Sequence, residues 1–322
     1  MSVPVLALAG FLGAGKTTLL NHLLRNSRGV RIGALVNDFG AVNIDAMFVA
    51  GQVDAMASLS NGCICCATDA SEAAEMLGRL AAVRPALDLI VVEASGIAEP
   101  PVLARTIAAA GDDRFHYAGL VLVVDTAQPA DLGHGVRVAD LVVLNKVADA
   151  PSTDAVDTLA ARVRAENPRV PLVYTDFARV DPTLLIDPPV RRPPQGPTQL
   201  SLDELLLEDS DHHDHEHPAY QSVEFSADAP VNPRRLMAFL QDRPAGLYRA
   251  KGFVDFGAGG RYGVQLVGSS LRFDKRGAAG RGSTLVLIGT GLDEAAVLSA
   301  LEDCTREPAD ENAMLAVHRY IV

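Results

Sequence analysis

The sequence feature that most constrains the fold is an apolar run that leads directly into a glycine-rich loop. Residues 3–9 have the pattern of a strand, and Gly10, Gly15, Lys16 and Thr17 then fit the pattern G-x-x-x-x-G-K-[ST]. Glycines let the backbone turn tightly, so that several N–H groups point at phosphate oxygens. A helix that begins at Lys16 directs its positive end towards the same anion. The predicted phosphate contacts are Gly10, Gly13, Ala14, Gly15, Lys16, Thr17 and Thr18.

Further short, continuously apolar runs follow at 31–37, 87–92, 119–124, 141–144 and 172–174, with helical patterns at 17–25 and 72–83. Strands of this kind, separated by helical stretches, are typical of a parallel sheet that is covered on both faces. The sequence therefore predicts an α/β fold. Polar residues stand where these strands end, and ligands of such sheets bind at that edge. They are Asn37-Asp38, Glu93, Asp125 and Asn145-Lys146.

The composition changes after Ile186. Residues 187–197 hold five prolines, which suits a linker, and residues 203–218 are acidic and histidine-rich. From Tyr220 onwards, strand patterns at 220–226, 248–256, 262–267 and 284–288 and helical patterns at 233–240 and 293–304 predict a small α+β domain. Its helices are expected on one face of an antiparallel sheet. We therefore predict a nucleotide-binding domain at 1–187, a linker at 188–218 and a C-terminal domain at 219–322.

An acidic residue and a glycine follow the predicted strand at 87–92. Glu93 is placed to order Mg²⁺ together with the Thr17 hydroxyl, while Lys16 reaches the β and γ phosphates. Gly96 offers a backbone N–H to the γ-phosphate without steric conflict. Asp38, in the loop after the second strand, is a candidate for Mg²⁺, for a transferred metal ion or for positioning water. A plain turn is the alternative for Asp38. The candidate catalytic residues are Lys16, Glu93 and Asp38.

Cysteine and histidine clusters indicate metal chemistry. Cys63, Cys65 and Cys66 place three thiols within four residues, a set suited to Zn²⁺ or Cu⁺ with one coordination position left open. Buried small residues or redox thiols are the alternatives. A second, weaker metal site is predicted in the linker, where a solvated tract is the alternative. Its residues are His212, His213, His215 and His217. Cys304 is expected to be a buried apolar residue.

The run Asn145-Lys146-Val147-Ala148-Asp149 is similar to the guanine-reading element N-K-x-D. In that element Asn contacts the base, Lys packs along the ring, and Asp accepts hydrogen bonds from guanine N1–H and N2–H₂. Here Ala148 occupies the fourth position and Asp149 lies one residue later, which turns its side chain in another direction. The expected selection of GTP over ATP is therefore relaxed, unless the loop rearranges to present Asp149, and ATP is not excluded.

Net charge and hydropathy exclude two classes of partner. A formal charge of −12 and a pI of about 5.1 argue against a nucleic-acid-binding surface. The apolar run near the N-terminus is too short to span a membrane, and no later run is long enough. We therefore expect a soluble, cytoplasmic protein that acts as a monomer or homodimer.

Taken together, these motifs make the chain resemble the CobW-type metal-binding GTPases, relatives of the nickel-insertion GTPases for urease and hydrogenase. The resemblance covers nearly the whole chain. It is carried by the phosphate loop, Asn37–Gly40 with Asn43-Ile44-Asp45, the C-x-C-C at Cys63–Cys66, Glu93–Pro100, Leu144–Lys146, the His-rich linker and Tyr248–Phe253. It implies an α/β fold of the P-loop NTPase type with a smaller α+β C-terminal domain, and GTP hydrolysis coupled to delivery of a metal, often zinc, to a client metalloprotein.

Three departures from the family pattern stand out. The family usually has Glu at the position of Asp38, often a second Glu at Ala41, and an Asp at Ala148. The leading interpretation is a GTP-hydrolysing metallochaperone for zinc. The first alternative is a metal store or sensor with vestigial hydrolysis, and the second is a small-molecule phosphotransferase.

Overall fold

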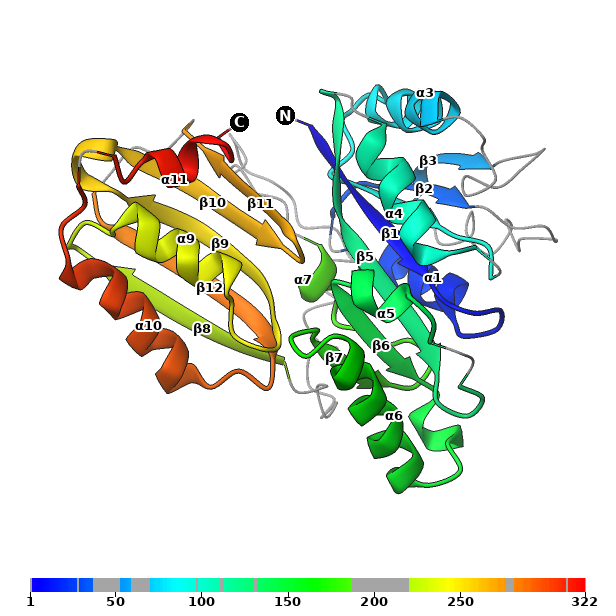
Figure 1. Ribbon diagram of the computed structural model, residues 1–322. Coiled ribbons are helices and arrows are strands. Elements are labelled where there is room, and N and C mark those ends of the chain that lie inside the picture. The colour runs from blue at the N-terminus through cyan, green and yellow to red at the C-terminus, as the bar shows by residue number, and fades with distance from the viewer. Residues whose placement is uncertain are drawn as a thin grey trace, which may run out of the picture.

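The computed structural model describes residues 2–27, 29–36, 53–58, 70–96, 98–110, 113–129, 132–186, 220–275, 281–310 and 312–321. These residues form two domains, each built on its own β-sheet (Figure 1). One sheet is parallel and the other is antiparallel. The α/β fold and the antiparallel C-terminal domain predicted from the sequence are both confirmed.

The N-terminal sheet has the strand order β3-β2-β4-β1-β5-β6-β7 among the described residues, and every neighbouring pair is parallel. Since all strands run the same way, the chain leaves each of them at one edge of the sheet. The strands are β1 (Val3–Ala9), β2 (Ile32–Val36), β3 (Val53–Ser58), β4 (Leu89–Glu93), β5 (Phe115–Asp125), β6 (Leu141–Asn145) and β7 (Leu172–Thr175).

Helices cover both faces of this sheet, which explains why its strands are continuously apolar. One face shares its core with α3 (Ala70–Ala81), α4 (Pro100–Ala109), α5 (Gly135–Val138) and α6 (Thr153–Glu166). The other face packs on α1 (Lys16–Arg25) and α7 (Pro182–Leu185). A 3₁₀ turn at Val147–Asp149 follows β6. No helix in the described part of the chain is long and apolar enough to cross a membrane.

Strand β5 begins earlier than the predicted run at 119–124. It starts at Phe115 because a bulge lets the chain continue its pairing with β1: Val5 pairs with Tyr117, and Leu6 pairs with Gly119. Gly119 has a φ of 141°, a conformation that glycine adopts readily. The glycine that interrupts the apolar pattern is therefore an irregularity inside the strand and not its boundary.

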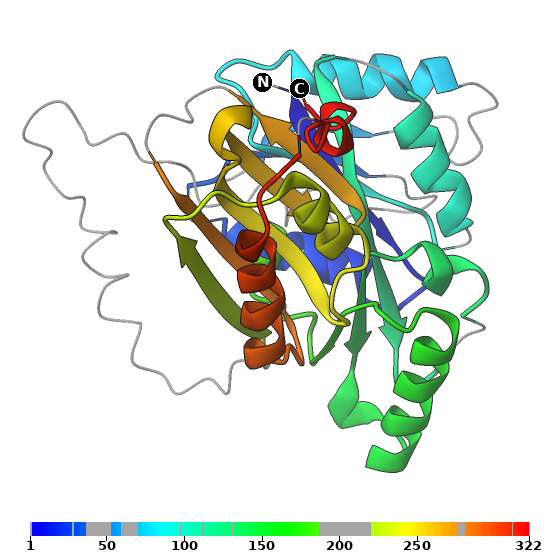
Figure 2. The ribbon, with the colours of Figure 1, turned by 60° about the vertical axis from the view of Figure 1, so that its left-hand side comes forward.

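The C-terminal sheet has the order β11-β10-β9-β12-β8. The predicted helices α9 (Pro233–Gln241) and α10 (Glu294–Arg306) lie on one of its faces, as expected (Figure 2). The short helix α11 (Leu315–His318), which was not predicted, packs into the same core. Cys304 is only 3% exposed in this core, as expected for an apolar residue, and burial raises its pKa to about 11. The strands are β8 (Tyr220–Ala227), β9 (Leu247–Asp255), β10 (Arg261–Val267), β11 (Ser270–Asp274) and β12 (Ser283–Thr290), and a 3₁₀ turn spans Gly257–Gly259.

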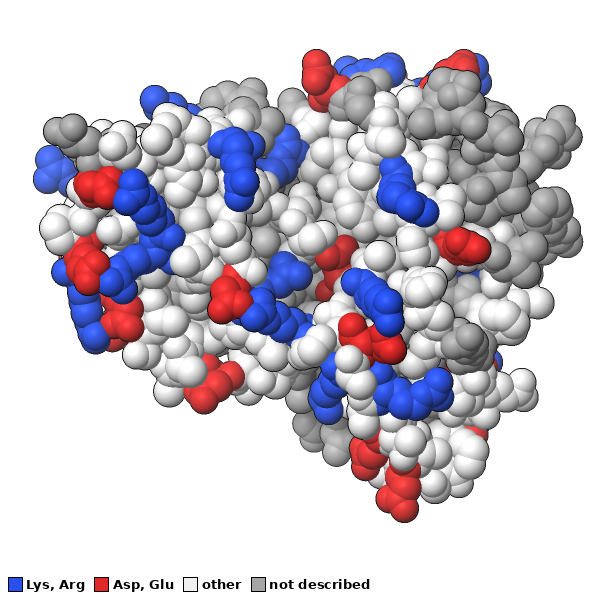
Figure 3. Space-filling view, in the orientation of Figure 1, with Lys and Arg blue, Asp and Glu red and all other residues white. Residues whose placement is uncertain are grey.

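Charged side chains of both signs are interspersed on the outer side of the C-terminal helices (Figure 3). Arg234 pairs with Asp310 at 2.5 Å, and Arg235 pairs with Glu307 at 2.6 Å. All four side chains are exposed, so these pairs contribute little to stability. This face of the molecule is mixed in charge and not uniformly basic.

The other face of the C-terminal sheet packs against the N-terminal domain. Tyr248 of β9 is fully buried in the core cluster that includes α1 and α7, and Tyr220 packs against the same cluster. The Tyr220 hydroxyl donates to Asp181 Oδ2 at 2.9 Å, and Ser269 N donates to Asp140 Oδ1 at 2.6 Å. Residues 187–219 lie outside the described residues, so the boundaries 1–187, 188–218 and 219–322 stay predictions.

Candidate nucleotide site

The predicted phosphate loop lies between β1 and α1, at the edge where the parallel strands end. Gly10 and Gly15 have φ angles of 143° and 109°, in the range that favours glycine. Space also demands glycine, because a Cβ at Gly10 would clash with the Val123 carbonyl and one at Gly15 with the Asn145 amide. The loop therefore lies directly against the ends of β5 and β6.

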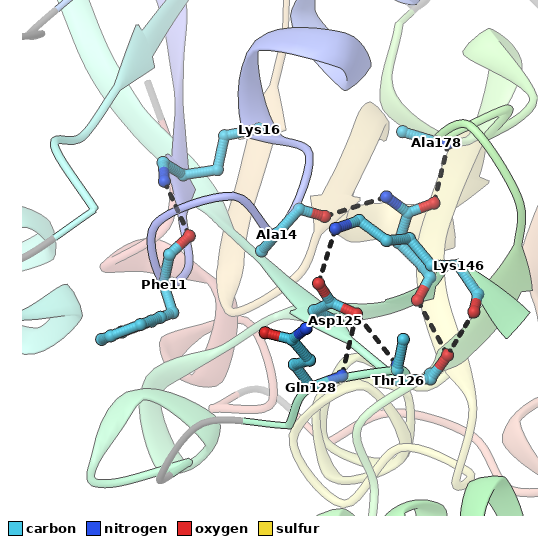
Figure 4. Close-up of polar contacts among 10 residues, drawn as sticks. Phe11, Ala14, Lys16, Asp125, Thr126, Gln128, Lys146 and Ala178 are labelled. Atoms are coloured by element: carbon cyan, nitrogen blue, oxygen red, sulfur yellow. Dashed lines mark hydrogen bonds and ion pairs between the residues drawn. The ribbon is translucent and has the colours of Figure 1, made fainter. Parts of the chain in front are cut away.

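Lys16 begins α1 and is only 6% exposed. Its Nζ donates to the Gly10 carbonyl oxygen at 3.0 Å and to the Phe11 carbonyl oxygen at 3.1 Å, and Figure 4 shows the second contact. The side chain therefore folds back across the loop. A phosphate oxygen entering the loop would meet this ammonium group. The geometry therefore suits the charge-stabilising role predicted for this residue.

Thr17 and Glu93 meet although they are far apart in the sequence. The Thr17 hydroxyl donates to Glu93 Oε1 at 2.5 Å, and Glu93, the last residue of β4, is only 5% exposed. A hydroxyl and a carboxylate are the hard oxygen ligands that Mg²⁺ prefers. The residues present thus fit a magnesium ion beside the phosphate loop.

The loop after β4 also touches the phosphate loop. A Cβ on Gly96 would lie 2.6 Å from the Leu12 Cα and 2.7 Å from the Leu12 N. A real Cβ essentially never lies so close to a heavy atom that is not bonded to it, so only a residue without a side chain allows this approach. The two loops that the sequence assigned to the phosphates are therefore in contact.

Asn145, predicted to contact the base, is only 2% exposed and connects two loops. Its Nδ2 donates to the Ala14 carbonyl at 2.8 Å, and its Oδ1 accepts from the Ala178 N at 2.9 Å (Figure 4). Buried polar groups need such partners. In the structure this side chain therefore joins the phosphate loop to the segment after β7.

Lys146 follows with a φ of 64°, and its Nζ contacts Asp125 Oδ2 at 2.6 Å. Burial acts to raise the pKa of the Asp125 carboxyl, but hydrogen bonds from Lys146 and from the Gln128 and Ala127 amides outweigh it, and the pKa lies below its ordinary value. The Thr126 hydroxyl donates to the carbonyls of Asn145 at 3.0 Å and Lys146 at 2.7 Å. These contacts fix the position of the lysine.

The sequence placed Asp125 at the ligand-binding edge of the sheet without a specific role, and it did not single out Thr126, Asp176 or Ala178. Asp125 ends an apolar strand, which is the signal that also marked Glu93. Asp176 directly follows β7, and its Oδ1 accepts from the Ala148 N at 2.9 Å. The positions of strand ends were therefore a usable signal. The sequence does not show which group each of these side chains contacts.

Several predicted residues lie outside the described residues. They are Asp38, the thiols Cys63, Cys65 and Cys66, and the linker residues His212, His213, His215 and His217. Within the described ranges no three His, Cys, Asp or Glu side chains gather as a metal site. Thr18 is described and exposed on α1.

Two family models match this chain. The CobW/HypB/UreG nucleotide-binding domain matches residues 4–174. The cobalamin synthesis protein cobW C-terminal domain matches residues 220–305. The first match covers the parallel sheet with the loops described above, and the second begins at the first strand of the antiparallel sheet.

Similar proteins include two that match over nearly their whole length. The zinc chaperone CobW of Sinorhizobium sp is 30% identical over 93% of this chain and 96% of its own. The zinc chaperone CobW of Pseudomonas aeruginosa is 30% identical over 93% and 90%. The zinc-regulated GTPase metalloprotein activator 1 of Dictyostelium discoideum is 39% identical over 32% of this chain and 24% of its own.

Proposed function

The chain belongs to the CobW/HypB/UreG family, and on that premise we propose that it is a GTP-hydrolysing metallochaperone that delivers zinc to a client metalloprotein. The observation that carries the proposal is the contact of Thr17 with Glu93 beside the phosphate loop. It joins the two parts of a nucleotide site that the sequence holds 76 residues apart. The names of the relatives support zinc as the cargo.

Hydrolysis in this proposal depends mainly on charge. Thr17 and Glu93 would hold Mg²⁺, which supplies positive charge to the phosphate oxygens. Lys16 turns from the loop carbonyls towards the γ-phosphoryl oxygens. Because Gly96 has no side chain, its backbone N–H can approach the same phosphoryl group. Asp38 would orient the attacking water. Asn145 and Lys146 would contact the base.

Zinc is the cargo, and Cys63, Cys65 and Cys66 are its proposed ligands. These thiols lie between the two predicted switch segments in the sequence, so that a change at the γ-phosphate can alter their geometry. Three thiolates favour zinc over cobalt or nickel. The histidines at 212–217 would form a weaker second site. A reducing cytoplasm, where we place the protein as a monomer or homodimer, keeps the thiols free.

The test measures zinc affinity and GTP turnover on the wild type and on Cys63→Ser/Cys65→Ser/Cys66→Ser. We expect zinc to change the GTPase rate of the wild type and to leave that of the variant unchanged. The variant should bind zinc more weakly in at least one nucleotide state. Cys304→Ala is the matched control, because this thiol is buried in the C-terminal core.

Three outcomes would contradict parts of the proposal. Equal zinc affinity of the wild type and the triple variant in both nucleotide states would remove the thiols as ligands. Negligible turnover with every metal and nucleotide would favour a metal store or sensor. Phosphate transfer to a metabolite in place of water would indicate a phosphotransferase.

A further inference from the structure

The guanine-reading element of this chain lacks its carboxylate, because Ala148 stands at the fourth position of N-K-x-D. The structure nevertheless places a carboxylate there. Asp176, which directly follows β7, accepts a hydrogen bond at Oδ1 from the Ala148 N at 2.9 Å. An aspartate at position 148 would hold its own carboxylate within a few ångström of the same amide nitrogen. The missing group is thus supplied from a neighbouring loop.

Asp149 is the other candidate, and its geometry is less suitable. Residues Val147–Asp149 form a 3₁₀ turn, closed by Asp149 N donating to the Lys146 carbonyl at 3.1 Å. Side chains in such a turn rotate by about 120° per residue. The Asp149 side chain therefore points away from the direction of Ala148, and the residue is exposed.

The loop that carries Asp176 is held in place on both sides. Before it, Thr175 is buried at the end of β7. After it, Phe177 and Ala178 have φ angles of 54° and 53°, which are uncommon for residues other than glycine, and the Ala178 N donates to Asn145 Oδ1. Residues kept in such conformations need support from their surroundings and gather at functional sites. Asn145 therefore fixes this loop relative to the same base-reading segment.

We propose that Asp176 is the residue that selects guanine. A carboxylate has room for about four hydrogen bonds, so Asp176 can keep the Ala148 amide and still accept from guanine N1–H and N2–H₂. Adenine presents a lone pair at N1 and no amino group at C2, so the same carboxylate disfavours it. The inference rests on the proposed GTP hydrolysis and identifies the source of its base specificity.

The test is Asp176→Asn, measured by fluorescence titration with N-methylanthraniloyl-GDP and by competition with GDP, XDP and ADP. An asparagine still accepts from the Ala148 amide through its carbonyl oxygen. Its side-chain NH₂ group faces the guanine N2–H₂ group, and two donors repel each other. Xanthine has a carbonyl oxygen at C2, which accepts a hydrogen bond from the same NH₂ group. We expect GDP to bind at least about tenfold more weakly and XDP to bind more tightly than to the wild type.

Asp149→Asn is the matched control, since it makes the same change in the adjacent turn and should leave the preference for GDP intact. A gain in XDP affinity cannot come from misfolding. Loss of GDP binding by Asp149→Asn and not by Asp176→Asn would overturn this inference while leaving GTP hydrolysis standing. If Asp176→Asn lost affinity for GDP without gaining affinity for XDP, the inference would also be overturned. Equal wild-type affinity for GDP and ADP would overturn the guanine preference in the proposed function itself.

Discussion

At the scale of single residues, the absence of one methyl group lets the two halves of the nucleotide site meet. Gly96→Ala would place a Cβ 2.6 Å from the Leu12 Cα and 2.7 Å from its N. Backbone atoms cannot move aside as a side-chain tip can, so the loops must separate. Overpacking typically costs about 1–3 kcal/mol. We expect a loss of that size in the free energy of unfolding by urea, together with weaker GDP binding.

Gly263→Ala is the control for this prediction. Its Cβ would lie 3.5 Å from the Asp274 carbonyl oxygen, an ordinary contact in the C-terminal sheet. This variant should keep the GDP affinity of the wild type. If Gly96→Ala bound GDP equally well, the close approach of the two loops would not be part of the nucleotide site.

At the scale of elements, the end of β6 holds two loops through one side chain. Asn145→Ala would leave the Ala14 carbonyl and the Ala178 N without their partner. A buried polar group that loses its hydrogen bond costs about 1–3 kcal/mol. We therefore expect a loss of that order in the free energy of unfolding and a clear loss of GDP affinity, because the phosphate loop is no longer fixed to β6.

Asn167→Ala is the control that separates an effect on the free energy of unfolding from an effect on GDP affinity. Asn167 follows α6, and its Nδ2 donates to the carbonyls of Val136 at 3.0 Å and Ala139 at 3.2 Å, away from the phosphate loop. This variant should lose stability while its GDP affinity stays unchanged. Equal effects of both substitutions on GDP binding would show that Asn145 acts on stability alone.

The strands of the parallel sheet were predictable because burial on both faces leaves a local signature, a continuous apolar run. Strand β3 was not predicted, since Val53–Ser58 mixes Asp and Ser with apolar residues. Strand β11 was missed for a related reason: Ser270–Asp274 is short and includes Arg272 among its polar residues. Among the described residues both strands lie at an edge of their sheet. Neither has the continuous apolar run that marks a strand buried on both faces.

The candidate site was predictable to the extent that its residues stand at strand ends. The loop pattern and the strand that ends at Glu93 placed Thr17 and Glu93 at one edge of the sheet. The link from Asn145 to Ala14 spans 131 residues, and the one from Asp176 to Ala148 spans 28. Periodicity carries no information about such pairs. Phe177 and Ala178 also have positive φ angles. Neither residue is a glycine, so the sequence does not indicate this conformation.

At the scale of the whole molecule, the two domains meet along β5 and β11 near the N-terminus. Ser2 Oγ lies 3.0 Å from the His116 Nδ1 and accepts from Arg272 Nη1 at 3.0 Å. Burial and the nearby Arg272 lower the pKa of His116 from 6.5 to about 4. A protonated imidazole would therefore face a guanidinium from the other domain. Acid should weaken this part of the interface.

The pH dependence of stability tests this. Between pH 6.5 and 4 the unfolded chain binds a proton at His116 that the native protein does not, so the free energy of unfolding falls as the pH falls. From pH 7 to pH 5 this amounts to about 2 kcal/mol. We expect His116→Asn, compared with the wild type in urea titrations, to lose less stability over that range by roughly this amount. Above about pH 8 both proteins should respond alike, because the imidazole is then almost wholly neutral in the folded and in the unfolded chain. If the free energies of unfolding of the wild type and of His116→Asn fell in parallel from pH 7 to pH 5, His116 would not contribute to the pH dependence of stability.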